Sequence, residues 1–502
     1  MSIMNDFFNE LSYRKIRYAH FKSNVNLDFS FNKTGDFDVI VDPQCHDDLY
    51  SVLAKFHAKQ MNTIRDKHYP GVDNWLFLDP DTGNIHHLHL HYQLVSGKAL
   101  VKEYMIPWRD FVFETRVYNE EFGIYTSDPN LEIILLNVRT VIKSRMKDWI
   151  KSRIGLYKTH KSLQSERTQI IEQCDKAVIK EYAQKLFGNL YSDRLYVIIC
   201  KPSIKGGEFN YLTKRVRKLL KDYRTKGGVA SSAASFKRRV SFYLHRHRKN
   251  KGIFTFNRKT SMTVGGIFAF VGVDGAGKST VVKEIYKWIS RQFDCQLVYM
   301  GLGDGKTTPL ASFLKKMRHV AGDNAGSVSV NSSSYVKKDP VPFFKNPKTY
   351  IRKRLLISTI YSVEKNNRKK LVKMNRYRIG GGLSVLDRYP QIELPNKNDG
   401  PKIEKYGEVI KAPGLIKRMT AKEMKALDIV KEIKPDIVFR INITAEESMK
   451  RKPEQTDIVS VQNKIDELHS ITFQNANIVD IDGMQPYDQE LLSIKKAIWA
   501  YL

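Results

Sequence analysis

The sequence has little cysteine and no long apolar run. Its 502 residues include four cysteines, and these share no CxxC or other metal-ligand spacing. We expect them to be reduced thiols, which is typical of a cytoplasmic protein. No apolar run approaches the roughly 20 residues that a membrane-spanning helix needs, and no N-terminal segment resembles a signal peptide. The sequence therefore predicts a cytoplasmic protein that is at most peripheral to a membrane.

Acidic residues are scarce in the middle of the chain. Residues 151–260 carry 27 Lys and Arg against 7 Asp and Glu, whereas residues 1–150 carry 17 against 20. This one block therefore contributes 20 of the net charge of +31. Such an excess of positive charge indicates an anionic partner, whether nucleic acid, lipid headgroups or an acidic glycan.

The composition predicts three domains. At about 150 residues per domain the length suggests this number, and a hydrophobic content of 42% is enough to fill more than one core. We place a first domain at residues 1–150, a basic and mostly helical connector at 151–262, and a last domain at 263–502. In the connector, the small residues of GGVASSAAS argue against a tightly packed core over residues 201–260.

Local patterns predict a mixed α/β chain. In the first domain, Phe37–Asp42 and His87–Tyr92 have the pattern of strands, and residues 47–60 that of an amphipathic helix. Residues 131–153 have helical periodicity and lead into the basic connector.

A complete phosphate-binding motif opens the last domain. Residues 272–279 read GVDGAGKS and match GxxxxGK[ST], between an apolar strand at 267–271 and a segment with helical spacing. The two loop glycines let backbone N–H groups approach phosphates closely, and the helix N-terminus adds positive potential. Lys278 would reach the outer phosphates, and the Ser279 hydroxyl would bind Mg²⁺. The predicted nucleotide-binding residues are Gly272, Gly275, Ala276, Gly277, Lys278, Ser279 and Thr280.

Two later segments complete the predicted site. The strand at residues 383–386 ends in Asp387 and Arg388, and a carboxylate at such a strand end is suited to hold metal or substrate. The strand at 434–442 leads into a helix that ends in Lys450-Arg451-Lys452-Pro453. We expect this basic cluster to close over the transferred phosphoryl group as a lid does.

In this order, FVGVDGAGKST, LDRYP and KPDIVFRINIT followed by MKRKPE resemble the motifs of thymidylate kinases, from about Gly265 onward. The resemblance implies a doubly wound, parallel five-stranded sheet and phosphoryl transfer that depends on ATP and Mg²⁺. It also implies that Asp274 and Arg388 face the acceptor, Asp387 the metal or acceptor, and Arg451 the phosphates. The segment after the DR motif, PQIELPNKNDGPKIEKYGE, lacks the serine-rich stretch that helps thymidylate kinases hold thymine. The acceptor therefore stays open among a nucleoside monophosphate, a sugar and a headgroup on a larger molecule.

The N-terminal domain resembles the nucleotidyltransferase superfamily. Lys22-Ser23 precedes Asp36-x-Asp38, and two carboxylates at this spacing share one face of a strand, where they can hold Mg²⁺ on a triphosphate. The resemblance implies an α+β fold. However, lysine replaces the usual glycine of the Gly-Ser turn, and His87, His89 and His91 stand where the family places a third carboxylate. Retained nucleotidyl transfer, a histidine-containing metal cluster, a substrate-contacting face and a solvated strand end all stay open.

The most basic stretch predicts a binding surface. Residues 214–259 carry sixteen Lys and Arg against one acid, Asp222, and aromatic residues are interspersed in the later part. We expect contact with an anionic membrane surface, or else a solvated linker; nucleic acid is less favoured because no recognition motif accompanies the charge.

The leading interpretation is an ATP-dependent kinase for a small-molecule, nucleotide or glycan acceptor. A chain with a second, nucleotidyltransferase activity is an extension of it. The alternative is a regulatory or defence protein in which the P-loop is a nucleotide switch and the N-terminal domain a sensor. An oligomer is compatible with each of these.

Overall fold

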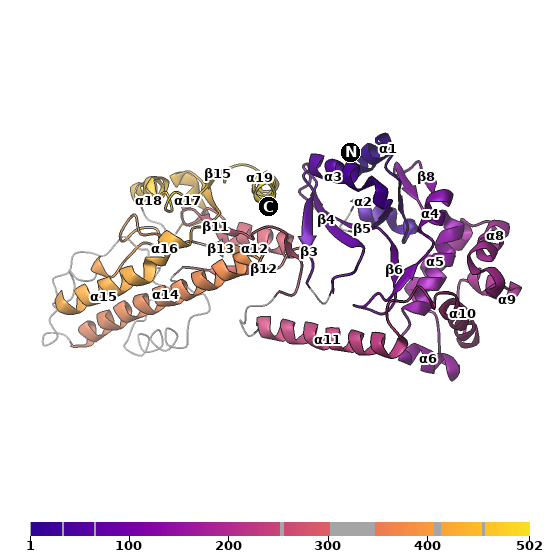
Figure 1. Ribbon diagram of the computed structural model, residues 1–502. Helices are drawn as coiled ribbons and strands as arrows, with labels where there is room; N and C mark the ends of the chain where they lie inside the picture. The colour runs from indigo at the N-terminus through magenta and orange to yellow at the C-terminus, as the bar shows by residue number, and fades with distance from the viewer. Residues whose placement is uncertain are drawn as a thin grey trace. The chain divides into compact units, whose positions relative to one another are not determined.

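The computed structural model describes residues 2–32, 35–64, 67–250, 256–301, 347–405, 413–453 and 457–502. The chain divides into two compact units, Met1–Lys259 and Thr260–Leu502 (Figure 1). Within the described parts of the chain, every helix is too short or too polar to cross a membrane.

The first unit is built on a mixed sheet. Its strands lie in the order β3 (Lys59–Asn62), β4 (Val72–Leu78), β5 (Ile85–His91), β2 (Asp36–Val41), β1 (Tyr18–His20), β9 (Ile124–Thr126) and β8 (Val117–Asn119). The β2–β5 and β1–β9 pairs are parallel, and the other pairs of this series are antiparallel. A separate hairpin joins β6 (Leu94–Ser96) to β7 (Tyr104–Ile106). The two strands predicted near residues 37–42 and 87–92 are confirmed as β2 and β5.

The side chains of β2 alternate between the two faces of this sheet. Phe37 and Val39 of β2 are fully buried against α1 (Ile3–Tyr13) and α3 (His46–Lys55), in a cluster rich in phenylalanine. Because successive side chains of a strand point to opposite faces, Asp36 and Asp38 lie on the other face. The helix predicted at 47–60 ends earlier, at Lys55, since His57 takes a left-handed φ of 49° and the chain then enters β3.

Most of the remaining helices of this unit follow the sheet strands in sequence. They are α2 (Leu27–Asn32), α4 (Arg109–Thr115), α5 (Pro129–Ile142), α6 (Met146–Arg153), α7 (Lys161–Glu172), α8 (Lys176–Phe187), α9 (Asp193–Ile199), α10 (Gly206–Leu219) and α11 (Gly228–Asn250). The single helix predicted at 131–153 is therefore two, α5 and α6. Helices α5 and α7 to α10 contribute buried side chains to the same hydrophobic cluster.

The basic segment is not a separate connector over most of its length. Phe209, Leu212 and Val216 of α10 are buried at helical spacing in the cluster that α5 also lines. The expectation of no tightly packed core over 201–260 is wrong for this helix, because its cationic residues occupy only its outer face. The composition indicates the charge, whereas the period of the apolar residues decides the packing.

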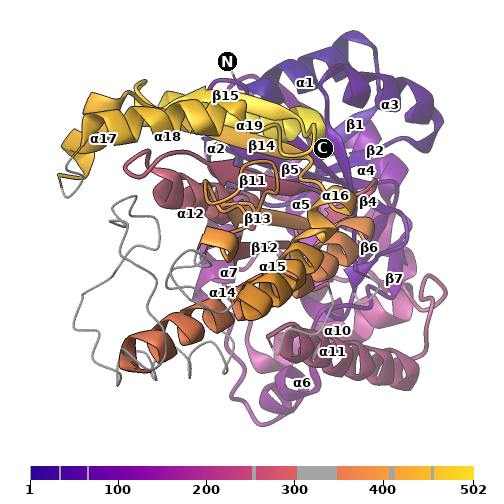
Figure 2. The same cartoon turned by 90° about the vertical axis from the view of Figure 1, so that its left-hand side faces the viewer.

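The second unit contains a parallel five-stranded sheet. Its order is β12 (Cys295–Tyr299), β13 (Leu383–Asp387), β11 (Ile267–Val271), β14 (Ile437–Asn442) and β15 (Ile478–Asp482), seen in Figure 2. The short β10 (Thr260–Ser261) precedes it. The predicted parallel five-stranded sheet is confirmed, as are the predicted strands at 267–271, 383–386 and 434–442.

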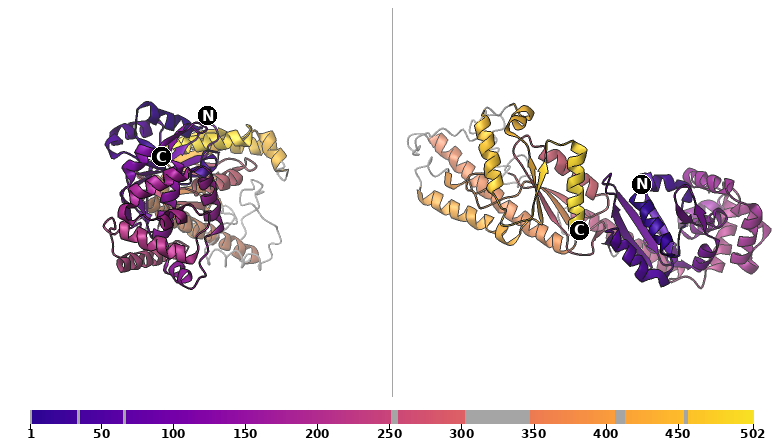
Figure 3. Two further views of the ribbon diagram at one scale, coloured as in Figure 1. Left: turned by 90° about the vertical axis from the view of Figure 1, so that its right-hand side faces the viewer. Right: turned by 90° about the horizontal axis from the view of Figure 1, so that it is seen from above.

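Helices cover both faces of this sheet. They are α12 (Lys278–Ile289), α14 (Pro347–Ile379), α15 (Pro413–Leu427), α16 (Ile429–Glu432), α17 (Ala445–Arg451), α18 (Ile458–Ser470) and α19 (Tyr487–Tyr501). Ala269 of β11 packs in a cluster with side chains of α14 and α18, whereas the Phe268 ring lies 5.5 Å from the Tyr501 ring of α19, centroid to centroid. Figure 3 shows this arrangement of helices on either side of the strands. The doubly wound architecture places every parallel strand's carboxyl end at one edge.

A buried arginine joins the helices of the first unit. Arg167 of α7 is 0% exposed, and its guanidinium donates to the Asn137 side chain at 2.6 Å and to the Ile198 and Ile199 carbonyls at 3.2 Å each. The two carbonyls belong to the end of α9, where intrahelical donors are lacking. Arg167 therefore satisfies that helix end while it links α5, α7 and α9.

We expect Arg167→Leu to lower the free energy of unfolding of the first unit, within the full chain, by about 3 kcal/mol. The reason is that the Asn137 side-chain oxygen and the Lys201 carbonyl lose the guanidinium that donates to them. Urea unfolding followed by far-ultraviolet circular dichroism measures the change. The matched control is Lys161→Leu, which removes an exposed cation from the same helix. Equal stability of the two variants would contradict the proposed role of Arg167.

Candidate functional site

The P-loop lies at the carboxyl edge of the second unit's sheet. It follows β11 and leads into α12, which begins at Lys278. Gly275 and Gly277 have φ of 88° and 84°, values that favour glycine. A Cβ added at Gly275 would also come within 3.0 Å of the Ser448 carbonyl. Both positions therefore need glycine, for conformation and, at Gly275, for space.

Lys278 is buried inside this loop. Its ammonium donates to the Val273 carbonyl at 2.7 Å, a neutral acceptor that phosphate oxygens could replace. Burial, and then the nearby Arg388, lower the pKa of Lys278 to about 8, although Asp274 and Asp387 oppose this shift. An ammonium that is buried with a neutral partner is suited to receive an anion.

The remaining predicted nucleotide-binding residues follow the same backbone path. Gly272 follows the strand directly, Ala276 is buried and donates its N–H to the Val273 carbonyl at 3.2 Å, and Thr280 is exposed in the first turn of α12. The structure thus places the whole motif between β11 and α12, as predicted from its flanking patterns.

Two oxygens meet beside the loop. The Ser279 hydroxyl donates to the Asp387 carboxylate at 2.8 Å. The parallel register brings these groups together, because Asp387 pairs with Phe270, two residues before the loop. Hydroxyl and carboxylate oxygens are ligands that Mg²⁺ prefers, so Ser279 and Asp387 fit the predicted metal position.

Arg388 lies between two carboxylates. Its guanidinium is 3.4 Å from Asp274 of the P-loop and 3.4 Å from Asp399. Asp399 raises the pKa of Arg388 above its ordinary value, more than burial lowers it. Burial would raise the pKa of Asp274, but Lys278 and Arg388 bring it below the usual range. The predicted acceptor-facing pair is therefore brought together as one ionised cluster.

Asp399 is a site residue that sequence reasoning missed. It lies in the Asn398-Asp-Gly-Pro401 segment, which the sequence marks only as a departure from thymidylate kinases. Asn398 and Asp399 have left-handed φ of 39° and 62°, and Arg388 itself has φ of 72°. Non-glycine residues in this region concentrate where the surroundings impose the conformation, frequently at functional sites. The Asn-Asp-Gly run was the available signal, since these residues tolerate that conformation.

A buried glutamate was missed as well. Glu364 of α14 is 5% exposed, and burial, followed by repulsion from Glu423 and Asp399, raises its pKa to about 8. The Asn367 amide lies 3.5 Å from it. Helical periodicity alone suggests a solvated charged face for this helix, but Glu364 lies on the buried face.

The predicted lid residue is near the loop but otherwise engaged. The guanidinium of Arg451 donates to Glu447 at 2.7 Å and to the Gly483 carbonyl at 3.2 Å. Helix α17 is attached to the P-loop through Ser448, whose hydroxyl donates to the Asp274 carbonyl at 2.7 Å. Arg451 therefore lies beside the P-loop, where its guanidinium forms an ion pair with Glu447.

A second polar cluster occupies β2 and β5 of the first unit. Asp38 accepts from Lys22 at 2.5 Å, and the rings of His91 and His89 lie 3.0 and 3.4 Å from the same carboxylate. Burial would raise the pKa of Asp38, but Lys22 and the histidines hold it well below the usual range. The Lys22 ammonium therefore occupies the position beside Asp38 where a nucleotidyltransferase-like site would hold a metal ion.

The neighbouring carboxylate has the same kind of partner. Asp36 lies 2.7 Å from Nδ1 of His87, and the ring of His87 also contacts the ammonium of Lys259 and the Asn74 amide oxygen. Lys259 is 172 residues from His87 in sequence, so no local pattern could have indicated it.

The fit of this cluster to Mg²⁺ is poor. Two donor sets, Asp36-His87-His89 and Asp38-His89-His91, each have ligand atoms within 4.8 Å of one another. Two imidazoles per carboxylate match zinc-like ions, whereas Mg²⁺ takes oxygen ligands. The Lys22 ammonium already neutralises Asp38. The residues present do not fit the Mg²⁺ position expected at Asp36 and Asp38.

Comparison with known proteins finds ATP-binding relatives over about half of the chain. No protein-family model matches the sequence. Over 237 residues the chain is 28% identical to the Escherichia coli strain K12 protein YghS, described as an uncharacterized ATP-binding protein; the match covers 47% of this chain and 93% of YghS. The similarly described YghR of the same strain is 27% identical over 243 residues, covering 47% of this chain and 87% of YghR.

Solved structures give a weaker likeness. Deoxyadenosine kinase from M. mycoides, with dCMP and a flexible dCDP bound, is 11% identical and has a TM-score of 0.26; the match covers 47% of this chain and 99% of that one. A likeness of this size carries no argument about either fold or function.

We expect the wild-type chain to bind Mg²⁺ no more tightly than its Asp36→Asn/Asp38→Asn variant. The reason is that the Lys22 ammonium occupies the position beside Asp38 that the metal ion would take. Calorimetric titration of the full chain with Mg²⁺, without nucleotide, measures this. Lys22→Ala is the matched test, since removing the ammonium should raise divalent-cation affinity, and adding Asp38→Asn should abolish the gain. A loss of Mg²⁺ affinity in the first double variant would restore the metal site predicted from the sequence.

Proposed function

We propose that the chain is an ATP- and Mg²⁺-dependent kinase that transfers the γ-phosphoryl group to a small acceptor. The observation that carries this proposal is the hydrogen bond between Ser279 and Asp387 beside the buried Lys278. It brings a phosphate cradle and an oxygen pair suited to a metal ion to one sheet edge. The ATP-binding descriptions of YghS and YghR agree with it.

Each residue of the loop has a role in this proposal. The backbone N–H groups around Gly275 and Gly277 would hold the phosphates, and Lys278 would exchange the Val273 carbonyl for the outer phosphates. Ser279 and Asp387 would hold Mg²⁺, which, when bound, neutralises charge on the phosphate oxygens. Arg451 would leave Glu447 and add positive charge where the phosphoryl group is transferred.

The acceptor side is defined by Arg388. One terminal nitrogen of its guanidinium lies 3.4 Å from Asp399 and the other 3.4 Å from Asp274, so the group is held in one orientation beside the P-loop, and an acceptor anion would share its N–H groups with these carboxylates. A planar fork is suited to a phosphate or carboxylate on the acceptor, which favours a nucleoside monophosphate or a phosphorylated sugar over a neutral sugar. A thymidylate-like acceptor and a glycan acceptor are both within this proposal.

The nucleotidyltransferase extension has less support. It requires metal at Asp36 and Asp38, where Lys22 lies 2.5 Å from the second carboxylate. We therefore confine the proposed chemistry to the second unit.

The alternative is a nucleotide switch with no fixed acceptor. Both proposals use the P-loop, but only the kinase would turn over ATP by transferring phosphate to an acceptor. A phosphate-transfer screen with γ-labelled ATP against nucleoside monophosphates, sugars and glycolipids separates them: labelled acceptor supports the kinase, whereas tight ATP binding without turnover supports the switch.

An anionic membrane surface is the proposed partner of residues 214–259. In α11, Lys237 and Arg246 are exposed, as is the ring of Tyr243. Each basic residue at an anionic bilayer contributes about 1 kcal/mol, and aromatic rings add contact at the headgroup level.

We expect Lys278→Ala to lower phosphoryl transfer by about 10²-fold or more, because the lost charge faces the developing charge of the transition state. Steady-state ATP turnover measures the effect, with Lys283→Ala on the same helix as the matched control. Near wild-type turnover in Lys278→Ala would contradict the proposed function.

We expect Arg388→Ala to raise the apparent KM for the acceptor by about tenfold or more while changing the KM for ATP less, because Arg388 is held between Asp274 and Asp399 instead of within the phosphate cradle. Asp387→Ala should instead lower kcat. Kinetics with the acceptor identified in the screen measure both. A change confined to ATP affinity in Arg388→Ala would overturn the assignment of Arg388.

A further inference from the structure

The first unit contains a cationic cavity that the proposed kinase chemistry does not use. It has a volume of about 760 Å³ and lies between the β6–β7 loop, the turn from α5 to α6, α10 and α11. Figures 1 and 2 both show α6, α10 and α11 gathered at this end of the unit. Six cationic residues line it, namely Lys98, Lys102, Lys143, Arg145, Arg217 and Arg239.

The charge of this cavity is not balanced by its own walls. None of the described residues that line it is acidic. Three acids lie behind or beside the lining. Glu103 accepts from the Lys98 backbone N–H at 2.9 Å, and its charge opposes the lowering by burial of the pKa of Lys98 and Lys102. Asp38 has the same effect on the pKa of Lys102 and Lys143 but is paired with Lys22, and Asp148 accepts from the Arg145 backbone N–H at 2.8 Å. The cavity is therefore a region of concentrated positive potential.

Its inner wall is where the basic side chains are most crowded. Lys143 is accessible to water yet surrounded by protein, as expected of a side chain on a cavity wall. Burial, followed by repulsion from Arg139 and Lys102, lowers its pKa to about 7. Behind the wall, the Nε of Arg139 is buried and has no hydrogen-bond partner among the described residues. Like charges crowded in this way are destabilising unless an anion joins them.

The outer wall adds aromatic surface. Trp149 and Phe236 line the same cavity and are 40% and 71% exposed. A volume of several hundred Å³ with apolar walls and convergent polar groups is the usual form of a small-molecule site. The combination indicates a ligand with a strongly charged group and an apolar or aromatic body.

We propose that this cavity binds a ligand that carries a diphosphate or triphosphate group, with the phosphates among its six cationic side chains. Arginine and lysine supply the donors that phosphate oxygens need, and six cations match an anion of more than one charge. Binding does not require a metal ion, because the cavity supplies the cations itself. A free nucleotide and a lipid diphosphate present the same group.

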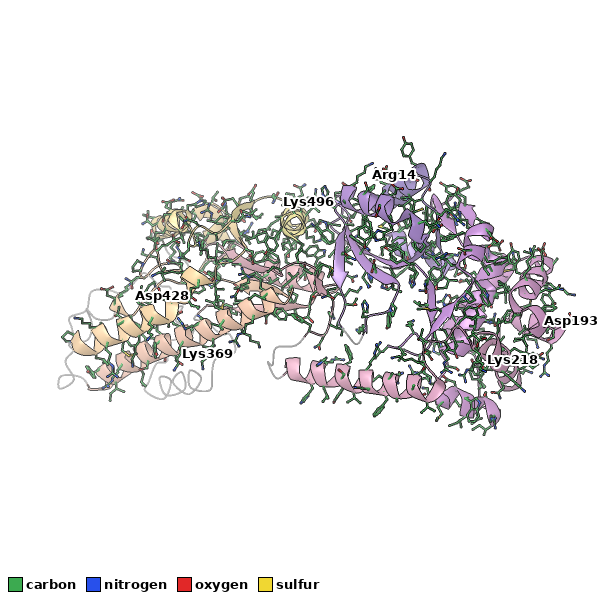
Figure 4. The ribbon with its side chains drawn as sticks, in the orientation of Figure 1. Arg14, Asp193, Lys218, Lys369, Asp428 and Lys496 are labelled. Atoms are coloured by element: carbon green, nitrogen blue, oxygen red, sulfur yellow. The ribbon has the colours of Figure 1, made fainter. Side chains whose placement is uncertain are left out.

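The experiment titrates the full chain with inorganic pyrophosphate in the presence of EDTA, by calorimetry. Arg145→Gln/Arg217→Gln/Arg239→Gln removes three cavity charges. Lys147→Gln/Lys218→Gln/Lys237→Gln is the matched control, since each position is exposed, close in sequence to its counterpart and absent from the cavity lining; Lys218 is labelled in Figure 4. Both variants carry the same change in net charge. A difference in their pyrophosphate affinity therefore reports contacts inside the cavity and not the net charge of the unit.

We expect the cavity variant to bind pyrophosphate at least about tenfold more weakly and the control within about twofold of wild type, because each lost ionic hydrogen bond costs about that much. Lys278→Ala should keep this site, which separates it from the P-loop and from failure of the proposed kinase. No pyrophosphate binding, or equal weakening in the two triple variants, would overturn the proposal.

A second arm identifies the source of the phosphates. Sedimentation of the wild-type chain with vesicles that contain a prenyl diphosphate lipid, with and without saturating pyrophosphate, distinguishes the two sources. Displacement of the bound protein by pyrophosphate assigns the cavity to a lipid phosphate. Pyrophosphate binding with vesicle partition that is unchanged assigns it to a soluble ligand. Circular dichroism of each variant verifies that the fold is retained.

Discussion

The parallel pairing of β11 with β13 is the constraint on which the second unit's site depends. It sets Phe270 opposite Asp387, so that one strand ends where the P-loop begins and the next ends in a carboxylate. The Arg388 N–H donates to the Phe270 carbonyl at 3.0 Å, which fixes the backbone immediately after Asp387. The Ser279–Asp387 hydrogen bond then follows from the register and needs no further adjustment. A shift of one residue would turn Asp387 to the opposite face of the sheet.

Charge is arranged around this edge so that the cations stay ionised and available. Lys278 is buried and has no ion-pair partner in direct contact within the described part of the chain, but Asp274 and Asp387 are near enough to support its charge. Arg388 shares Asp274 with the loop and takes a second carboxylate from Asp399. A phosphate that entered would find positive groups already oriented, which is the form of electrostatic preorganisation that supports transfer of charged groups.

What the sequence could predict depended on whether the signal was local. The P-loop, β11 and Asp387 were all predicted because each is encoded by contiguous residues with a fixed period. Asp399 was missed because it reaches Arg388 through a turn with left-handed residues, whose path no periodicity describes. Lys259 was missed because it meets His87 across 172 residues.

The prediction for the basic middle segment failed for a different reason. Its charge is evident from composition, but its packing depends on the spacing of the apolar residues along α10. Arg167 shows the same limit: a cation on a helix suggests solvent, yet this one is fully buried, where it donates to the end of α9 and to Asn137. Composition records how many charges a segment has, whereas burial depends on which face of the helix carries them.

The carboxylates of the two units have different partners, and this difference indicates different roles for the two units. In the second unit, Asp387 accepts from a hydroxyl, a partner that a metal ion can share. In the first, the Lys22 ammonium donates to Oδ1 of Asp38 and neutralises it, so a metal ion would have to displace this ammonium. The same unit collects six further cations around a cavity whose described lining residues include no acid. Transfer of a phosphoryl group requires a metal site beside preorganised positive groups, whereas retention of phosphates requires only the positive groups. On this physical ground we assign the proposed phosphoryl transfer to the second unit, and the proposed recognition of a phosphorylated ligand to the first.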